Sequence, residues 1–199
     1  MSLYPLFLKL SGRRVLVVGG GTVATAKVAA LQEAGADIAV VAPEPAPELL
    51  QAAAAGKISL ARRSFEAGDL AGTWLVVSAA TPEVNRIVAA AAESRRLFVL
   101  AVDDQPAASA YGAGTLRRGG VTVAVSTEGR APALAGLLRE ALEAVLPDDL
   151  DAWMAEAERV RAGWREAGVP MAERRPLLLR ALNQLYQAKS STIDAKVTP

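Results

Sequence analysis

Short apolar runs alternate with helical stretches along the first half of the chain. The runs are rich in β-branched residues, and the stretches between them repeat apolar residues at three- to four-residue spacing, as in Val23, Ala26 and Ala30. Strands are predicted over Arg14–Val18, Asp37–Ala42, Lys57–Ala61, Trp74–Ser78 and Leu97–Val102. Helices are predicted over Thr22–Ala34, Pro47–Ala55 and Glu83–Ser94. Nearly continuous apolar strands that alternate with helices predict an α/β fold with a parallel sheet covered on both faces.

The pattern changes after Asp103. A glycine-rich, basic stretch over residues 112–120 precedes one more strand, Val121–Ser126, and a strong helix, Pro132–Val145. Two further helices are predicted over Leu150–Ala167 and Met171–Gln187. Residues 189–199 lack periodicity and are predicted to be disordered. The α/β domain is therefore expected to be followed by a small helical region.

Composition narrows the chemistry that the chain can perform. Its 199 residues include 22 Lys and Arg against 21 Asp and Glu, so the net charge of +1 gives no general attraction to nucleic acid or an anionic membrane. There is no Cys and no His, which excludes thiolate and His-based catalysis. Proton transfer must use carboxylates, Lys, Tyr, hydroxyls, the backbone or the substrate itself. Neither a membrane-spanning run nor a signal peptide is seen, and we expect a cytoplasmic protein.

The strongest local motif is a glycine turn that matches G-x-G-x-x-A between a strand and a helix. Gly19 permits the tight turn, Gly21 lets the backbone approach a diphosphate, and Ala24 lets the helix pack close to the strand. The helix start at Thr22 and Val23 offers free N–H groups to phosphate. The motif predicts a dinucleotide site in a Rossmann-like domain; the alternative is a tight turn that binds nothing.

The ends of the second and fourth strands supply further candidates for cofactor binding. An acidic residue usually ends the second strand and holds a ribose hydroxyl, but here Pro43 stands there and Glu44 follows, so either Glu44 or the backbone around Pro43 takes that role. No Arg follows at once, which favours NAD over NADP. Ala80 and Thr81 are small residues where a dinucleotide would cross the sheet edge; the alternative is an ordinary loop with Thr81 as helix N-cap.

The fifth strand ends in Val102, Asp103 and Asp104. Val102 is placed to line the cofactor, and the two carboxylates of Asp103 and Asp104 are the best acid–base candidates in a chain without His. The alternative is that the acidic pair only forms a turn or caps a helix.

Several motifs in the same order resemble those of the precorrin-2 dehydrogenases, which also form the amino-terminal part of sirohaem synthases. The resemblance spans residue 4 to about residue 150 and rests on Tyr4–Leu10, Gly19–Lys27, Glu33–Ala36, Val40–Pro43, Ser78–Thr81, Val84–Asn85, Glu93–Arg96, Val102–Asp103, Val123–Thr127, Pro132–Ala135 and Leu137–Glu140.

What the resemblance implies is a homodimeric enzyme that uses NAD+ to oxidise precorrin-2 to sirohydrochlorin. Many members also insert Fe2+ as a substrate, and no resident metal site is expected here. The family's important aspartate falls on Asp103, and its serine-rich substrate loop falls on Ser126 and Thr127. Of the nearby cations, Arg130 is the first candidate partner for the tetrapyrrole's carboxylates, ahead of Arg117 and Arg118.

The resemblance also implies a division of the chain and shows some departures. We expect an NAD-binding Rossmann domain over residues 1–112, a dimerisation region over 113–148 and a helical domain over 149–188. Leu100 stands where the family often has Asn, and Ala131 where it often has Ser, which weakens the expectation of Fe2+ insertion but leaves the nucleotide site intact. Two alternatives are another NAD-linked oxidoreductase and an NAD-binding sensor without turnover.

Overall fold

The computed structural model describes residues 3–197, with side chains described as far as residue 184. The chain divides into two compact units. The first holds the residues up to Gly112 together with Ser126–Ala131, and the second holds Ala113–Val125 with the residues from Pro132 onward. Residues 126–131, predicted as part of the 113–148 region, thus group with the first unit.

The first unit is built on a five-stranded sheet whose neighbouring strands are all parallel. The strands are β1 (Arg14–Val18), β2 (Asp37–Val41), β3 (Ser59–Ala61), β4 (Leu75–Ser78) and β5 (Phe98–Ala101), and their order across the sheet is β3-β2-β1-β4-β5. This arrangement confirms the predicted α/β fold. The third strand is shorter than predicted, because it begins at Ser59 rather than at Lys57.

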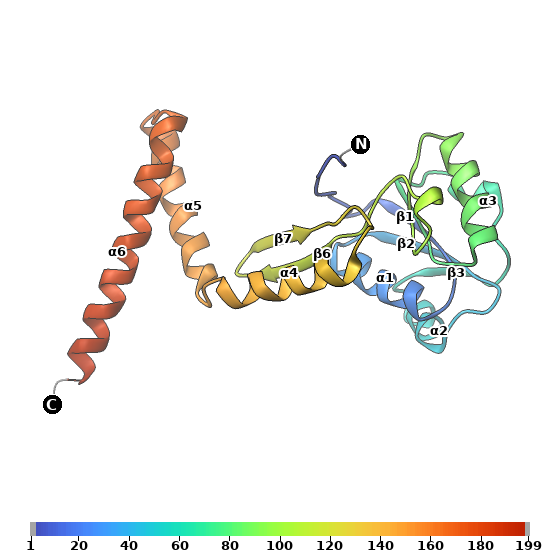
Figure 1. Ribbon diagram of the computed structural model, residues 1–199, viewed down its shortest axis with the longest axis horizontal. Coiled ribbons are helices and arrows are strands. Elements are labelled where there is room, and N and C mark those ends of the chain that lie inside the picture. Colours follow the sequence, from blue (N-terminus) through green and yellow to red (C-terminus); the bar gives the residue numbers. More distant parts are fainter. Residues whose placement is uncertain (1–2, 198–199) are drawn as a thin grey trace. The chain divides into compact units, whose positions relative to one another are not determined.

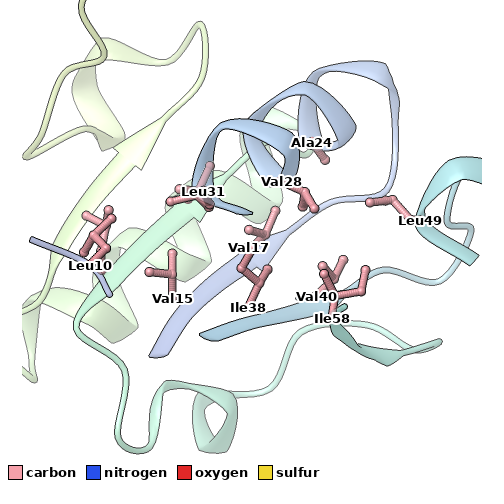
Figure 2. Packing of buried hydrophobic residues seen from close by; sticks show 12 residues of the cluster. Leu10, Val15, Val17, Ala24, Val28, Leu31, Ile38, Val40, Leu49 and Ile58 are labelled. Carbon is pink, nitrogen blue, oxygen red and sulfur yellow. The ribbon is translucent and has the colours of Figure 1, made fainter. Parts of the chain in front are cut away.

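Helices cover both faces of this sheet, as predicted (Figure 1). They are α1 (Thr22–Glu33), α2 (Pro47–Ala54) and α3 (Pro82–Glu93), with short 3-10 turns η1 (Ala67–Leu70) and η2 (Gln105–Ala107). Alternate residues of each strand point to opposite faces, so Val15 and Val17 pack in one apolar cluster while Leu16 and Val18 pack in the other. Figure 2 shows the first cluster, in which Val28 of α1 and Leu49 of α2 lie over the strands.

The second unit contains a hairpin and three helices. Strands β6 (Gly114–Arg118) and β7 (Val121–Val125) pair antiparallel, and α4 (Pro132–Val145) packs against both. Helices α5 (Leu150–Glu166) and α6 (Met171–Val197) pack against each other (Figure 1). The helix boundaries of α4 and α5 agree with the predicted ones to within a residue.

Two elements of the second unit, one strand and one helix, differ from the predictions. Strand β6 was predicted only as a glycine-rich basic stretch, because Leu116 is the one buried apolar residue in it. Helix α6 was predicted to end at Gln187 with disorder from residue 189, whereas the structure carries the helix to Val197. Residues 198 and 199, the last of that predicted segment, lie outside the described residues.

Candidate dinucleotide site at the carboxyl edge of the sheet

The carboxyl ends of four strands meet in one row along the sheet edge. Backbone hydrogen bonds continue one residue beyond the paired strands: Gly19 N donates to Val41 O (3.0 Å), Ala79 N to Val18 O (2.8 Å) and Val102 N to Ser78 O (2.9 Å). From β1 the sheet order runs in one direction to β2 and β3 and in the other to β4 and β5. Ligands of such folds bind in the crevice at this switch point, which here lies between β1 and β4.

This row brings together the residues that were singled out at separate strand ends in the sequence. The glycine turn follows β1, the Pro43–Glu44 pair follows β2, the Ala80–Thr81 pair follows β4, and the Val102–Asp103 pair follows β5. All of them belong to the first unit. These residues share one edge because the strands are parallel, and the backbone hydrogen bonds between neighbouring strand ends hold those ends side by side.

The glycine turn has the geometry that a bound diphosphate needs. Gly19 has a φ of 122°, and a Cβ there would overlap the carbonyl oxygen of Ala79. A Cβ on Gly21 would meet no protein atom within 4 Å, so the space over Gly21 is open. Ala24 is fully buried, as the close packing of helix on strand requires.

The first turn of α1 offers unpaired amides beside that open space. Gly21 is the N-cap and supplies no side chain, and the first turn contains no acidic residue. The first N–H groups of a helix have no partner within the helix, and within the described residues the structure records no acceptor for the amides of Thr22 and Val23. The residues present therefore fit a dinucleotide's diphosphate, which the partial positive charge of the helix end also favours.

Gly20 is a residue whose role the sequence reasoning missed. A Cβ on Gly20 would lie 2.6 Å from Glu44 O and 2.8 Å from Pro45 Cα, and Gly20 O accepts a hydrogen bond from Ala46 N (2.8 Å). The loop after β2 is thus held directly against the glycine turn. A third glycine, where the motif requires only two, was the signal for this contact.

The side chains after β2 remain open to solvent. Pro43 and the Glu44 side chain are exposed, while the Glu44 carbonyl faces Gly20. The role of these two residues in holding a ribose stays a prediction.

A buried amide fixes the loop after β4. Asn85 of α3 is 1% exposed, and its Oδ1 accepts hydrogen bonds from Ser78 Oγ (2.7 Å) and from Ala80 N (3.3 Å). Thr81 is the N-cap of α3 by its backbone, but its hydroxyl makes no cap bond to the backbone. The Glu83 backbone amide, and after it the Thr81 hydroxyl, lowers the pKa of the Glu83 carboxyl.

The two acidic residues after β5 have different environments. Asp104 caps η2: its Oδ1 accepts from Ala107 N (3.4 Å), while its Oδ2 is buried with no hydrogen-bond partner among the described residues. Asp103 is exposed and has a φ of 54°, a left-handed conformation that few residues other than glycine adopt. The capping role that competed with catalysis thus falls on Asp104, and the carboxylate of Asp103 is accessible at the edge.

The loop that carries the predicted substrate residues is closed by its own hydrogen bonds. Glu128 N donates to Ser126 Oγ (3.1 Å), and Ala131 N donates to Thr127 Oγ1 (3.2 Å). Arg130 Nη2 lies 3.7 Å from Glu128 Oε2, and the Arg130 side chain is 78% exposed. The loop belongs to the same unit as Asp103.

Arg118 has its own partners in the second unit. Its Nη1 donates to Leu146 O (2.7 Å) and Asp148 Oδ1 (3.2 Å). Two acceptors of the same unit therefore occupy the Arg118 guanidinium.

The described part of the chain lacks two kinds of feature, one for metals and one for membranes. It contains no group of three or more His, Cys, Asp or Glu side chains arranged to hold a metal ion. None of its helices combines the length and the apolar character needed to cross a bilayer.

Comparison with known families assigns the chain. Residues 6–113 match the family described as "Putative NAD(P)-binding", and residues 118–144 match the one described as "Sirohaem biosynthesis protein central". The chain belongs to the family described as putative NAD(P)-binding, whose model matches more than half of it. The resemblance that the sequence motifs indicated is thereby confirmed.

Individual relatives agree with the family. "Siroheme synthase 3" of Aeromonas hydrophila subsp. hydrophila is 42% identical over 92% of this chain and 39% of its own length. "Siroheme synthase" of Neisseria meningitidis serogroup C is 41% identical over 84% of this chain and 34% of its own length. The chain thus spans less than two fifths of the length of these synthases.

A solved structure shares the fold over nearly the whole chain. The protein "SirC, precorrin-2 dehydrogenase" is 25% identical, covers 89% of this chain and 88% of its own, and superposes with a TM-score of 0.69. Because the match covers 89% of this chain, the shared fold includes elements beyond the Rossmann-like unit.

Proposed function

We propose that this chain is an NAD-dependent precorrin-2 dehydrogenase of sirohaem synthesis. The observation that carries the proposal is the open glycine turn at the same sheet edge as the exposed carboxylate of Asp103, in a member of this family. A sensor of NAD needs the glycine turn but has no use for the acid.

The dinucleotide is held by the backbone more than by side chains. The amides of Thr22 and Val23 bind the diphosphate over Gly21, and the small residues Ala80 and Thr81 leave room for it to cross the edge. The exposed carboxylate of Glu44 favours a ribose hydroxyl over a 2′-phosphate, which supports NAD as the cofactor.

Oxidation of precorrin-2 to sirohydrochlorin removes two hydrogens from the macrocycle. NAD+, when bound, would supply the hydride acceptor and leave as NADH, and one proton would remain for the protein to remove. Asp103 would accept that proton, directly or through a water molecule, and Val102 would line the site of the redox ring. The protein contributes mainly by positioning the two reactants.

The carboxylates of the tetrapyrrole require polar and cationic partners. Arg130 offers an exposed guanidinium, and the hydroxyl of Thr127 accepts from Ala131 N but keeps its hydrogen to donate. Ser126 lies at the start of the same loop. We assign the three residues to substrate binding.

The apolar face of α4 supports a homodimer. Leu134, Leu137, Leu138, Leu142 and Val145 are all exposed, between 37% and 74%, whereas Ala135 faces the hairpin and is buried. A contiguous apolar helix face of this kind is characteristic of an interface.

The cytoplasm is the proposed compartment. Fe2+ is a second proposed substrate, for insertion into the sirohydrochlorin product.

The proposal is tested by mixing the full chain with precorrin-2 and NAD+ and following NADH absorbance together with the spectrum of sirohydrochlorin. Both signals are expected to rise in proportion. Binding of NAD+ without NADH formation would contradict the proposal and favour a sensor. Subsequent addition of Fe2+, with anaerobic recording of the sirohaem spectrum, tests insertion separately.

Replacing Asp103 with Asn tests the acid itself. Asn tolerates the left-handed backbone that Asp103 adopts, so the substitution removes the charge with little strain. We expect the rate of NADH formation to fall about 100-fold or more, the contribution typical of a positioned general base. The matched control is Asp148→Asn, an exposed acid of the second unit, and full dehydrogenase turnover in Asp103→Asn removes Asp103 from the mechanism.

A further inference from the structure

The loop 126–131 lies in the chain between two elements of the second unit but groups with the first. β7 precedes it and α4 follows it, both of which belong to the second unit. A side-chain hydrogen bond joins it to the first unit: Gln105 Nε2 donates to Gly129 O at 2.6 Å. A longer contact, Leu3 N to Glu128 Oε1 at 3.5 Å, joins the loop to the amino-terminal segment.

The backbone of the loop is shaped to receive Gln105. Glu128 and Gly129 both have positive φ values, 57° and 73°, so the chain turns sharply at this point. A Cβ on Gly129 would lie 2.7 Å from Gln105 Nε2, closer than nonbonded atoms tolerate. Glycine at position 129 therefore permits both the turn and the approach of the amide.

Gln105 connects this loop to the acidic turn by a short path. It is the first residue of η2, directly after the cap Asp104 and two residues after Asp103. Hydrogen bonds within the loop also hold Thr127 in place. Arg130 N donates to Thr127 O (3.0 Å), and Ala131 N donates to Thr127 Oγ1 (3.2 Å). One contact thus ties the proposed substrate loop to the turn that holds the proposed acid.

We propose that Gln105 is a positioning residue. Its hydrogen bond is a clasp that holds the substrate loop, residues 126–131, against the turn that carries Asp103, so that the tetrapyrrole's carboxylates are bound at a fixed position relative to Asp103. This inference rests on the proposed function. Gln105 does not touch the reacting atoms. It acts through Gly129 on Thr127 and Arg130, so its effect falls on the tetrapyrrole and not on NAD+.

Gln105→Met removes the donor at nearly equal side-chain length, and Gln105→Lys restores a donor. For Gln105→Met we expect the KM for precorrin-2 to rise about two- to tenfold, the range for one net hydrogen bond, with the KM for NAD+ unchanged. Gln105→Lys is expected to recover at least part of the loss. Gln51→Met, the same substitution at an exposed position of α2, is the matched control and is expected to leave both constants unchanged.

A second readout does not require activity. The Arg130 side chain is exposed and Ala131 follows it, so trypsin can cut there once the loop opens. We expect cleavage after Arg130, mapped by mass spectrometry, to be faster in Gln105→Met than in the wild-type chain or in Gln51→Met.

The outcomes separate the two proposals. A wild-type chain that forms no NADH from precorrin-2 overturns the proposed function. A wild-type chain that turns over, beside a Gln105→Met variant with an unaltered KM for precorrin-2, overturns only the clasp. Equal changes in both KM values, with a lowered melting temperature, show a merely structural role and overturn it as well.

Discussion

Gly20 and Gly21 are neighbours in the chain, yet the structure gives them opposite reasons to be glycine. Gly20 is enclosed by the loop after β2, where backbone atoms that cannot move aside occupy the place of a side chain. Gly21 has a φ of −82°, which any residue adopts, and it faces open space. The first glycine therefore serves the fold, and the second serves the ligand.

Substituting each of these glycines with alanine should separate stability from binding. We expect Gly20→Ala to lower the free energy of unfolding by about 1–3 kcal/mol, because the added methyl meets fixed backbone. Gly21→Ala should change stability by no more than about 0.5–1 kcal/mol, since its conformation and surroundings accept a side chain.

Nucleotide binding should show the reverse order. Gly21→Ala is expected to weaken NAD+ binding about tenfold or more, because the methyl occupies the path of the diphosphate. Urea unfolding and titration calorimetry of both variants measure the two effects. Normal NAD+ affinity in Gly21→Ala contradicts the placement of the diphosphate over this residue.

At the scale of elements, a buried polar contact joins helix α3 to the end of strand β4. Ser78 is fully buried, and its hydroxyl donates to Asn85 Oδ1. The same oxygen accepts from Ala80 N, so one side chain fixes the loop that lines the edge. The cost of disturbing this contact depends on which group is left without a partner.

Two variants test that dependence. Ser78→Ala removes one donor and leaves the Asn85 amide bonded to Ala80, so we expect a loss of about 1 kcal/mol in unfolding free energy. Asn85→Leu leaves both Ser78 Oγ and Ala80 N without their acceptor, and we expect a loss of about 2–4 kcal/mol. Urea titration gives both values, and equal losses contradict the assigned contacts.

The turn η1 of the first unit takes part in an ion pair, between Arg63 and Asp69, whose contribution to stability depends on pH. Asp69 accepts two hydrogen bonds from Arg63 (2.6 and 2.9 Å) and one from Glu66 N (2.9 Å). Arg63 is the main cause of a lowered pKa for Asp69, and the Glu66 amide adds to it. A carboxyl whose pKa is lower in the folded state stabilises the fold above its unfolded pKa of about 4, and this stabilisation disappears as the pH falls through the folded pKa.

Asp69→Asn should therefore change the acid limb of the stability curve. At pH 7 the variant is expected to be less stable than the wild type, and the difference should shrink as the pH is lowered below about 4. Chemical unfolding between pH 2 and pH 7 measures it. A difference that stays constant over that range contradicts the role given to Asp69.

How far the sequence predicts each element depends on whether its signal is local. Helix α4 was predicted with its bounds because apolar spacing and an initial proline lie within the segment itself. The hairpin strand β6 was missed, although Gly119 and Gly120, both with positive φ, are the turn signal that could have revealed it. The bond from Gln105 to Gly129 spans 24 residues and has no local signature, so only the structure reveals it.

At the scale of the whole molecule, the proposed homodimer rests on the net charge and on one exposed apolar surface. A chain with a net charge of +1 has little repulsion to oppose self-association. The exposed leucines of α4 supply the apolar surface for it.

We expect Leu137→Glu to convert a dimer to a monomer, because the side chain is 64% exposed in the single chain and a buried charge at an interface is costly. Analytical ultracentrifugation measures the mass. Leu50→Glu, at a 40% exposed leucine of α2, is the control and should leave the dimer intact. A monomeric wild-type chain contradicts the proposed homodimer.

The assignment of residues 126–131 to the first unit has a mechanical consequence. The polypeptide passes between the two units at three places, after residues 112, 125 and 131. Three covalent connections therefore join the two units, where a simple two-domain chain has one. Cutting the chain at Gly112 would not release the whole first unit, because its residues 126–131 would remain on the other fragment.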